Sequence, residues 1–302
     1  MRHNYHFLGA ATTCSAVTHH LLVHKQLQPH EWKNIQGAKD AVNKEWDQLD
    51  SIDFVDYATV ASMADKKVEA KHSSKTYHFG RVFPLCHIKH SELDAKYHQY
   101  KGRCVFGGND IRDESGVLAI FQEQGASASS MTAAKLLDAL ARFPGYIGEN
   151  ADACKAYTQC LLADFEGNTE TWVELPRDRW PDAWFKDGSK RQVPRFERPV
   201  VRLLRNLYGH PLAGLWWERH CHARILSCGF KPVQGWECLY VHPAKKAWLS
   251  VYVDDLKLAC RACDKDGIWK DLQSKIKLDP PTKKLNKGKN VKNPREYNKT
   301  GI

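Results

Sequence analysis

The chain reads AWLSVYVDDLKLA from Ala247 to Ala259. Apolar residues fill both ends of this stretch, and the acidic pair Asp254-Asp255 stands between them. Because Asp is a common turn residue, the pattern predicts a β-hairpin with both carboxylates at its tip. Two adjacent carboxylates on a tight turn repel each other and lose hydration, and a bound divalent cation offsets both costs. The alternative is an ordinary solvated turn that contains two Asp residues.

Further helices and strands are predicted on both sides of the hairpin. Apolar residues at helical spacing predict helices over residues 37–50, 155–162, 212–227 and 268–276, and another that starts at Ser129 or Ser130 and stops at Pro144. Strands are predicted over residues 76–88, 102–111, 171–175 and 237–242, and a short strand is predicted to end at Asp152. This order of helices and mostly antiparallel strands indicates an α+β fold. Regular βαβ alternation and a Gly-rich phosphate loop are both missing from the sequence, which argues against Rossmann and P-loop folds.

The composition is that of a folded, basic protein. Its 302 residues are enough for one large domain or two smaller ones. The formal net charge of +10 attracts polyanions, of which nucleic acid is the commonest. No apolar run is long enough to cross a bilayer, and the N-terminus is too polar for a convincing signal peptide. We therefore expect an intracellular protein that has no membrane partner.

The ten cysteines are scattered along the chain, without the spacing of a secreted disulfide framework. The single C-x-x-C pair, Cys260 and Cys263, lacks a second pair of zinc ligands at suitable spacing. The run His220-Cys221-His222 is rich in metal ligands but has no regular partner. We expect reduced thiols and ordinary histidines, and a zinc site is the alternative.

Several motifs, in their order along the chain, resemble those of one enzyme family. Tyr252-Val253-Asp254-Asp255 has the form usual in the catalytic hairpin of copia-type retrotransposon reverse transcriptases. Residues 151–157, ADACKAY, resemble the first catalytic motif of that family, in which an Asp ends a strand and an aromatic residue follows five positions later. Residues 203–209, LLRNLYG, resemble its leucine, basic residue, leucine, tyrosine, glycine segment, which an aromatic-rich helix follows. The resemblance covers about Val42 to Leu278, which is most of the chain.

This resemblance implies a right-hand polymerase fold with fingers and palm. The palm would be an antiparallel sheet with helices packed on one face, and the thumb would be missing or partial, because one helix and a lysine-rich end follow the hairpin. Residues 1–36 would be an irregular N-terminal segment and residues 37–128 the fingers. Residues 129–278 would be the palm, with a fingers-like insertion at about 163–205. Residues 279–302 would be a basic disordered tail.

The resemblance also assigns catalytic roles to individual residues. Asp152 and Asp254 would bridge two Mg²⁺ ions, for which Mn²⁺ is a substitute, and Asp255 would support the second ion. Tyr157 would lie under the sugar and exclude a 2′-hydroxyl. The alternative for Tyr157 is an aromatic residue in the core.

Four further residues are expected to bind the dNTP. Lys101 and Arg103 would cradle the triphosphate, since basic side chains bond phosphate oxygens well; the alternative is exposed charge on the fingers. Tyr208 and Gly209 would line the nucleotide pocket, and a turn into the next helix is an alternative compatible with that role. The chain departs from the family in residues 210–214, HPLAG, where a Lys and a Gln are usual.

The implied function is that of an RNA-directed DNA polymerase, which transfers a nucleotide from a dNTP to the primer 3′-hydroxyl of an RNA or DNA template-primer. Such an enzyme works in a cytoplasmic virus-like particle or in the nucleus. The rest of a Pol polyprotein, ribonuclease H and integrase, is not expected in this chain. The alternative is a truncated, catalytically silent retroelement remnant that only binds nucleic acid.

Overall fold

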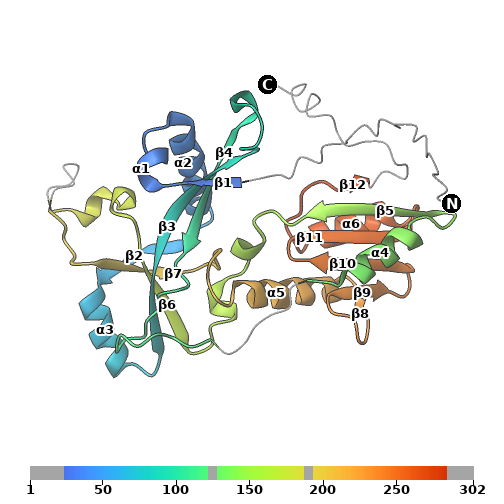
Figure 1. The fold of residues 1–302 in the computed structure, drawn as a ribbon. Helices are drawn as coiled ribbons and strands as arrows, with labels where there is room; N and C mark the ends of the chain where they lie inside the picture. The colour runs from blue at the N-terminus through green and yellow to red at the C-terminus, as the bar shows by residue number, and fades with distance from the viewer. Residues whose placement is uncertain (1–23, 122–127, 187–192, 284–302) are drawn as a thin grey trace, which may run out of the picture. The chain divides into compact units, whose positions relative to one another are not determined.

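The computed structural model describes residues 24–121, 128–186 and 193–283 (Figure 1). These residues form two units, and the first consists of the described parts of residues 1–44 and 85–103. The second unit contains the described residues of 45–84 and 104–302. Most of the predicted N-terminal segment and of the predicted basic tail lies outside the described residues.

The first unit is small and has its own apolar core. It contains the whole of β1 (His24–Leu27), α1 (Pro29–Trp32) and η1 (Ala95–Tyr97). It also contains parts of three longer elements, α2 (Gln36–Asp50), β3 (Thr76–Lys89) and β4 (Gln99–Phe106). β1 pairs antiparallel with the end of β3, so that Leu27 faces Cys86. Trp32 and Val42 are buried with them. The expectation that residues up to 36 are irregular is therefore wrong for residues 24–36.

The second unit contains a mixed sheet. Here β3 pairs parallel with β6 (Thr169–Glu174). β6 pairs antiparallel with β7 (Pro199–Leu203), and β7 pairs antiparallel with β2 (Val55–Ser62). α3 (Met63–His72) follows β2, and the Ser62 side chain caps it by accepting a hydrogen bond from the Asp65 N–H. Phe54, Val173 and Leu203 are fully buried in the core of this region.

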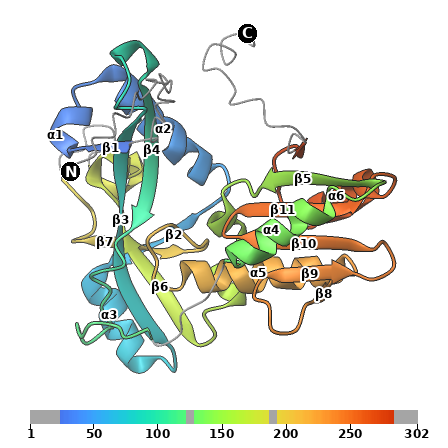
Figure 2. The same cartoon turned by 45° about the vertical axis from the view of Figure 1, so that its right-hand side comes forward.

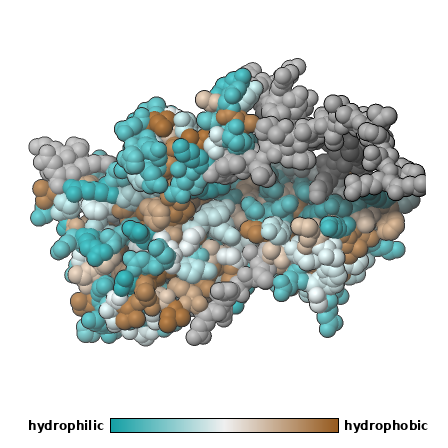
Figure 3. All heavy atoms as spheres, in the orientation of Figure 1, coloured by the Kyte–Doolittle hydropathy of each residue, from teal (hydrophilic) through white to brown (hydrophobic). Residues whose placement is uncertain are grey.

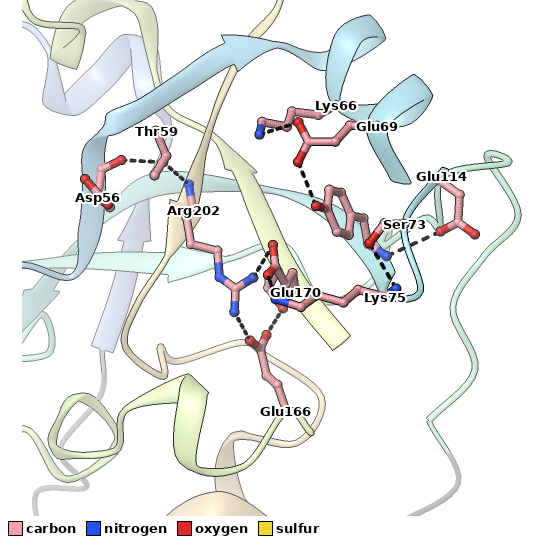
Figure 4. Close-up of polar contacts among 12 residues, drawn as sticks. Asp56, Thr59, Lys66, Glu69, Ser73, Lys75, Glu114, Glu166, Glu170 and Arg202 are labelled. Atoms are coloured by element: carbon pink, nitrogen blue, oxygen red, sulfur yellow. Dashed lines mark hydrogen bonds and ion pairs between the residues drawn. The ribbon is translucent and has the colours of Figure 1, made fainter. Parts of the chain in front are cut away.

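An ion network ties the mixed sheet to the turn that precedes β6. The Arg202 guanidinium lies 2.8 Å from Glu166 and 2.6 Å from Glu170, and Lys75 lies 2.6 Å from Glu170. Figure 4 shows Arg202 between the two glutamates. The Glu166 side chain is almost completely buried, at 2% exposure, and also accepts a hydrogen bond from Thr171. Burial raises the pKa of Glu166 to about 7, although Thr171 and Arg202 oppose this shift.

A second sheet of the same unit is wholly antiparallel. Its strand order is β12-β5-β11-β10-β9-β8; the bounds are β12 (Thr282–Lys283), β5 (Tyr146–Asp152), β11 (Asp255–Arg261), β10 (Ala247–Tyr252), β9 (Leu239–His242) and β8 (Lys231–Pro232). The predicted hairpin is β10 and β11, with Tyr252 opposite Asp255. The last strand, β12, extends the sheet beyond β5 in a part of the chain that was predicted to be a disordered tail.

Helices cover both faces of the antiparallel sheet: α4 (Met131–Leu140), α5 (Ala213–Ser227) and α6 (Lys265–Gln273). On one face, α5 and α6 bury Trp217, Ile225 and Leu272 against side chains such as Leu249 of β10. On the other, α4 buries Leu137 against Leu239, Ala259 and their neighbours, and Figure 2 shows α4 lying across the strands. Strand side chains alternate between the two faces of a sheet, and here each face carries apolar residues. Helices on both faces therefore shield these apolar side chains from water. The expectation of helices on one face only is therefore wrong.

The predicted α+β class is confirmed, and most elements lie where they were expected. Residues 155–162 are the main exception. They form only the short 3₁₀ turns η2 (Ala156–Gln159) and the start of η3 (Leu162–Asp164), because Lys155 adopts a left-handed conformation with φ +48°. The predicted strand over 102–111 ends at Phe106. Within the residues that the structure describes, every helix is too short or too polar to span a bilayer.

The second unit also exposes several large apolar side chains. Val117, Leu118 and Ile120 are 62%, 52% and 85% exposed. Figure 3 shows one face of the molecule, on which apolar residues are scattered among hydrophilic ones.

Candidate active site

The two predicted carboxylate segments meet at one end of the antiparallel sheet. Asp152 is the last residue of β5 and Asp255 the first residue of β11, and they are direct partners in the antiparallel register. Directly opposed residues carry their side chains on the same face, with Cβ atoms about 5 Å apart. One residue further on, the Ala153 N–H donates to the Asp254 carbonyl at 2.7 Å. The fold thus brings together segments that are about a hundred residues apart in sequence.

The turn between β10 and β11 has an unusual backbone. Val253 has φ +55°, which β-branched residues rarely adopt and which costs on the order of 1–3 kcal/mol. Trp217 of α5 holds this turn, because its indole N–H donates to the Val253 carbonyl. Tyr252 and Asp254, on either side of Val253, are exposed to solvent. The turn, which Trp217 holds in a strained conformation, therefore exposes Asp254 to solvent, whereas Asp255 is partly buried.

Like charges gather around Asp152. Partial burial and the negative charges of Asp254 and Asp279 raise the pKa of Asp152 above its ordinary value. Asp254 and Asp279 therefore each lie close enough to Asp152 to repel its charge. A cation bound among them would relieve this repulsion.

The carboxyl oxygens at this end of the sheet fit Mg²⁺ in their chemistry. Mg²⁺ prefers hard oxygen ligands, and it commonly uses one or two carboxylates with water and substrate phosphates completing its shell. Among residues 24–121, 128–186 and 193–283, no three His, Cys, Asp or Glu side chains are grouped to hold a metal ion.

Two tyrosines that were predicted to contact the nucleotide pack against each other, and one of them, Tyr157, lies near Asp254. Tyr157 is in η2, and its ring centroid is 4.6 Å from that of Tyr208. Burial and the negative charge of Asp254 raise the pKa of the Tyr157 hydroxyl. Lys155, whose φ turns the chain into η2, forms an ion pair with Glu45 at 3.3 Å. Tyr157 therefore lies between Tyr208, which its ring contacts, and Asp254, whose charge acts on both Tyr157 and Asp152.

Gly209 has a conformational requirement of its own. Its φ is +90°, and a Cβ atom there would collide with the Phe106 carbonyl. The Phe106 N–H donates to the Tyr208 carbonyl at 2.7 Å, and a Cβ atom on Gly108 would collide with the Gly209 carbonyl. The glycine is needed for this close backbone approach, whether or not a nucleotide binds there.

Lys101 and Arg103 lie on β4 in the first unit, whereas the carboxylates belong to the second. Both basic residues are partly buried and alternate with the buried Gly102. A Cβ atom on Gly102 would collide with the Ala41 carbonyl of α2. Because strand side chains alternate, Lys101 and Arg103 point away from that helix.

The segment after α6 was not predicted to contact the site, but it packs against the first motif. The Asp279 N–H donates to the Asp152 carbonyl at 2.8 Å, and the Cys154 N–H donates to the Lys277 carbonyl at 2.9 Å. We refer to residues 277–279 as the strap. Its one visible signal in the sequence is an Asp just before Pro280, at the start of a stretch that otherwise resembles a lysine-rich tail.

The remaining ligand-rich motifs lie within the described residues, among which no three His, Cys, Asp or Glu side chains are grouped to hold a metal ion. Cys260 is buried in β11 and Cys263 is exposed, and the cysteines of the described residues are free thiols. Cys221 is buried in α5, while the ring of His222 lies 3.1 Å from the Tyr240 hydroxyl. These contacts agree with ordinary core and surface residues.

Comparison with known proteins gives no match to a family model and no match to a curated protein.

Proposed function

We propose that this chain is an RNA-directed DNA polymerase of the copia retrotransposon type. The observation that carries the proposal is the antiparallel pairing of Asp152 with Asp255, together with the charge of Asp254 acting on Asp152. A solvated turn would not need a second carboxylate segment beside it, because like charges at short range cost free energy. In this proposal the antiparallel sheet is the palm, and the fingers are formed by about residues 37–128.

Each carboxylate has a role in this proposal. Asp152 and Asp254 would hold Mg²⁺, or Mn²⁺ as a substitute, and Asp255 would support them from the opposite strand. Such ions lower the pKa of a primer 3′-hydroxyl and neutralise charge on a leaving pyrophosphate. The raised pKa of Asp152 and the hard oxygen donors support this assignment.

The tyrosine pair would select the sugar. The Tyr157 ring packs against Tyr208 at 4.6 Å, and this contact would limit its movement. A fixed ring beneath the sugar leaves no room for a 2′-hydroxyl, so deoxynucleotides would be preferred. Gly209 would keep the backbone of this pocket in place.

Primer extension tests the proposal directly. The full chain is incubated with poly(rA), oligo(dT), dTTP and Mg²⁺, and we expect incorporation that Asp254→Asn reduces by at least about a hundredfold, as loss of a charged group at a reacting centre does. Asp264→Asn is the matched control, because Asp264 pairs with Arg261 at the far end of β11. Equal incorporation by the wild type and Asp254→Asn would contradict the proposal.

A second candidate is a remnant that binds nucleic acid without copying it. The net charge of +10 supports this candidate independently of the carboxylates. It predicts that the wild type and Asp254→Asn are equally inert in primer extension, yet bind duplex with the same affinity and the same dependence on salt.

A further inference from the structure

The strap is attached to the first catalytic motif by side chains as well as by backbone. The Cys154 thiol donates a hydrogen bond to the Asp279 carboxylate at 2.9 Å. The Gln159 amide donates to the Lys277 carbonyl at 3.0 Å and accepts from the Lys277 N–H at 2.9 Å. The same amide nitrogen donates to the Cys154 carbonyl at 2.9 Å. Residues on both sides of the turn after Asp152 are therefore fixed to the strap.

The backbone of Asp152 is held from two directions. On one side, Asp255 is its partner in β11. On the other, the Asp279 N–H donates to its carbonyl. This second bond uses only the backbone of Asp279, so any residue except proline could make it.

The side chain of Asp279 needs a separate explanation. Its negative charge raises the pKa of Asp152, and this repulsion between like charges opposes folding. An amide side chain would accept the same thiol hydrogen bond without that cost. A carboxylate is advantageous where positive charge binds, and Asp152 and Asp254 are the groups proposed to bind it.

We propose that Asp279 is a positioning residue of the carboxylate site. Its backbone fixes the Asp152 carbonyl, and its carboxylate, oriented by the Cys154 thiol, adds negative charge that strengthens divalent cation binding by Asp152 and Asp254. Asp279 acts through these two residues and is not itself a ligand. The inference rests on the proposed function, because the bound divalent cation is part of that proposal.

Direct metal binding tests this role without relying on catalysis. Mn²⁺ is titrated into the full chain, and free Mn²⁺ is measured by electron paramagnetic resonance. We expect Asp279→Asn, which keeps an oxygen acceptor for Cys154, to raise the Kd for Mn²⁺ about three- to tenfold, as removal of one partly screened charge near a divalent ion does. Cys154→Ser keeps a donor and should stay within about twofold of the wild type.

The control removes the same charge elsewhere. Asp271 lies on α6, is 53% exposed and pairs with Lys245, so Asp271→Asn should leave the Kd unchanged. Thermal unfolding of each variant checks that it is folded. In primer extension, the Asp279→Asn effect should fall on the Mg²⁺ concentration that gives half the maximal rate rather than on the rate at saturating Mg²⁺.

The outcomes separate this inference from the proposed function. If Asp279→Asn binds Mn²⁺ as the wild type does, while Asp152→Asn does not bind it, the role of Asp279 is overturned and the carboxylate site stands. If the wild type and Asp152→Asn bind Mn²⁺ equally, the metal site of the proposed function is overturned, and the role of Asp279 with it.

Discussion

Asp152 and Asp255 are direct partners in the antiparallel pairing of β5 with β11. Their side chains therefore share a face of the sheet, at the end where the turn of the hairpin carries Asp254. The charges of Asp254 and Asp279 both act on Asp152. In the absence of a cation, this arrangement opposes folding, because like charges are held closer than in the unfolded chain. The stability of the protein and its proposed activity should therefore respond in opposite directions to loss of one carboxylate.

The first prediction follows from this opposition. Without metal, Asp152→Asn should increase the free energy of unfolding by about 0.5 kcal/mol, a modest amount because the site is open to solvent and its charges are screened. With Mg²⁺ at millimolar concentration, the wild type should gain stability by mass action and the variant should not. Urea unfolding at pH 7.5, with and without Mg²⁺, measures both effects. Equal gains from Mg²⁺ in the two proteins would contradict the prediction.

The second prediction concerns Gly209. Gly209→Ala should decrease the free energy of unfolding by at least about 3 kcal/mol, because the new methyl group combines an unfavourable φ with a collision against the Phe106 carbonyl. Gly116→Ala is the matched control. Gly116 has a similar φ of +85°, but open space surrounds its Cβ position, so only the conformational cost of about 1 kcal/mol should remain. Urea unfolding at one pH measures the difference, and equal losses would show that the backbone approach does not matter.

Local patterns predicted the hairpin but not the residues that support it. The apolar strands around Asp254 specify β10 and β11 without help from the rest of the chain. Asp152 could be assigned only from the resemblance, since nothing near it in sequence shows that β5 pairs with β11. The need for glycine at position 209 depends on Phe106, about a hundred residues away, and the strap depends on a contact between Asp279 and β5. Such long-range contacts leave no periodic signal.

The predicted helix over 155–162 failed for a different reason. Its residues are apolar on several sides, and a short buried segment of this kind can be mistaken for a helix. In the structure, Ala156 packs against the antiparallel sheet, whereas Leu162 packs against the core of the mixed sheet. The left-handed conformation of Lys155 and the two short turns allow Ala156 to pack into one core and Leu162 into the other. One regular helix would not reach both cores.

The third prediction concerns pH and His210. This ring is buried against Phe106 and stacks on Trp216 at 4.5 Å between centroids. Burial, with a smaller contribution from the charge of His78, lowers the pKa of His210 to about 3. Below pH 6.5 the unfolded chain therefore binds a proton that the folded chain does not, and stability falls as the pH decreases from 6.5 towards 3. Between pH 7.5 and 5.5 this residue alone should cost about 1.4 kcal/mol.

His210→Asn isolates that contribution. The His210 Nδ1 atom accepts a hydrogen bond from the Leu212 N–H at 3.2 Å, and an Asn side-chain oxygen is suited to accept the same bond. The variant should be less stable at pH 7.5, because ring packing is lost, but its stability should fall less between pH 7.5 and 5.5. Urea unfolding of both proteins over this range measures the difference in slope. Parallel curves would show that His210 becomes protonated in the folded state.

The fourth prediction concerns Arg202 and the two glutamates beside it (Figure 4). Arg202→Met would leave Glu166 and Glu170 facing each other in a largely buried position. We expect a loss of about 3–5 kcal/mol at pH 8, as for other broken buried ion pairs. Glu166→Gln should cost far less. Since the folded-state pKa of Glu166 is raised to about 7, its ionisation opposes folding as the pH rises from about 4.5 to 7, and the amide does not ionise.

The double variant provides the control for that comparison. If unpaired carboxylate charge causes the loss in Arg202→Met, then adding Glu166→Gln should recover at least about 1 kcal/mol of it, because one of the two negative charges is gone. At pH 5 the recovery should shrink, since Glu166 is then mostly protonated in the folded protein. Urea unfolding of the four proteins at both pH values completes the cycle. Purely additive effects at pH 8 would mean that Arg202 stabilises the sheet through packing of its aliphatic stem, not through its charge.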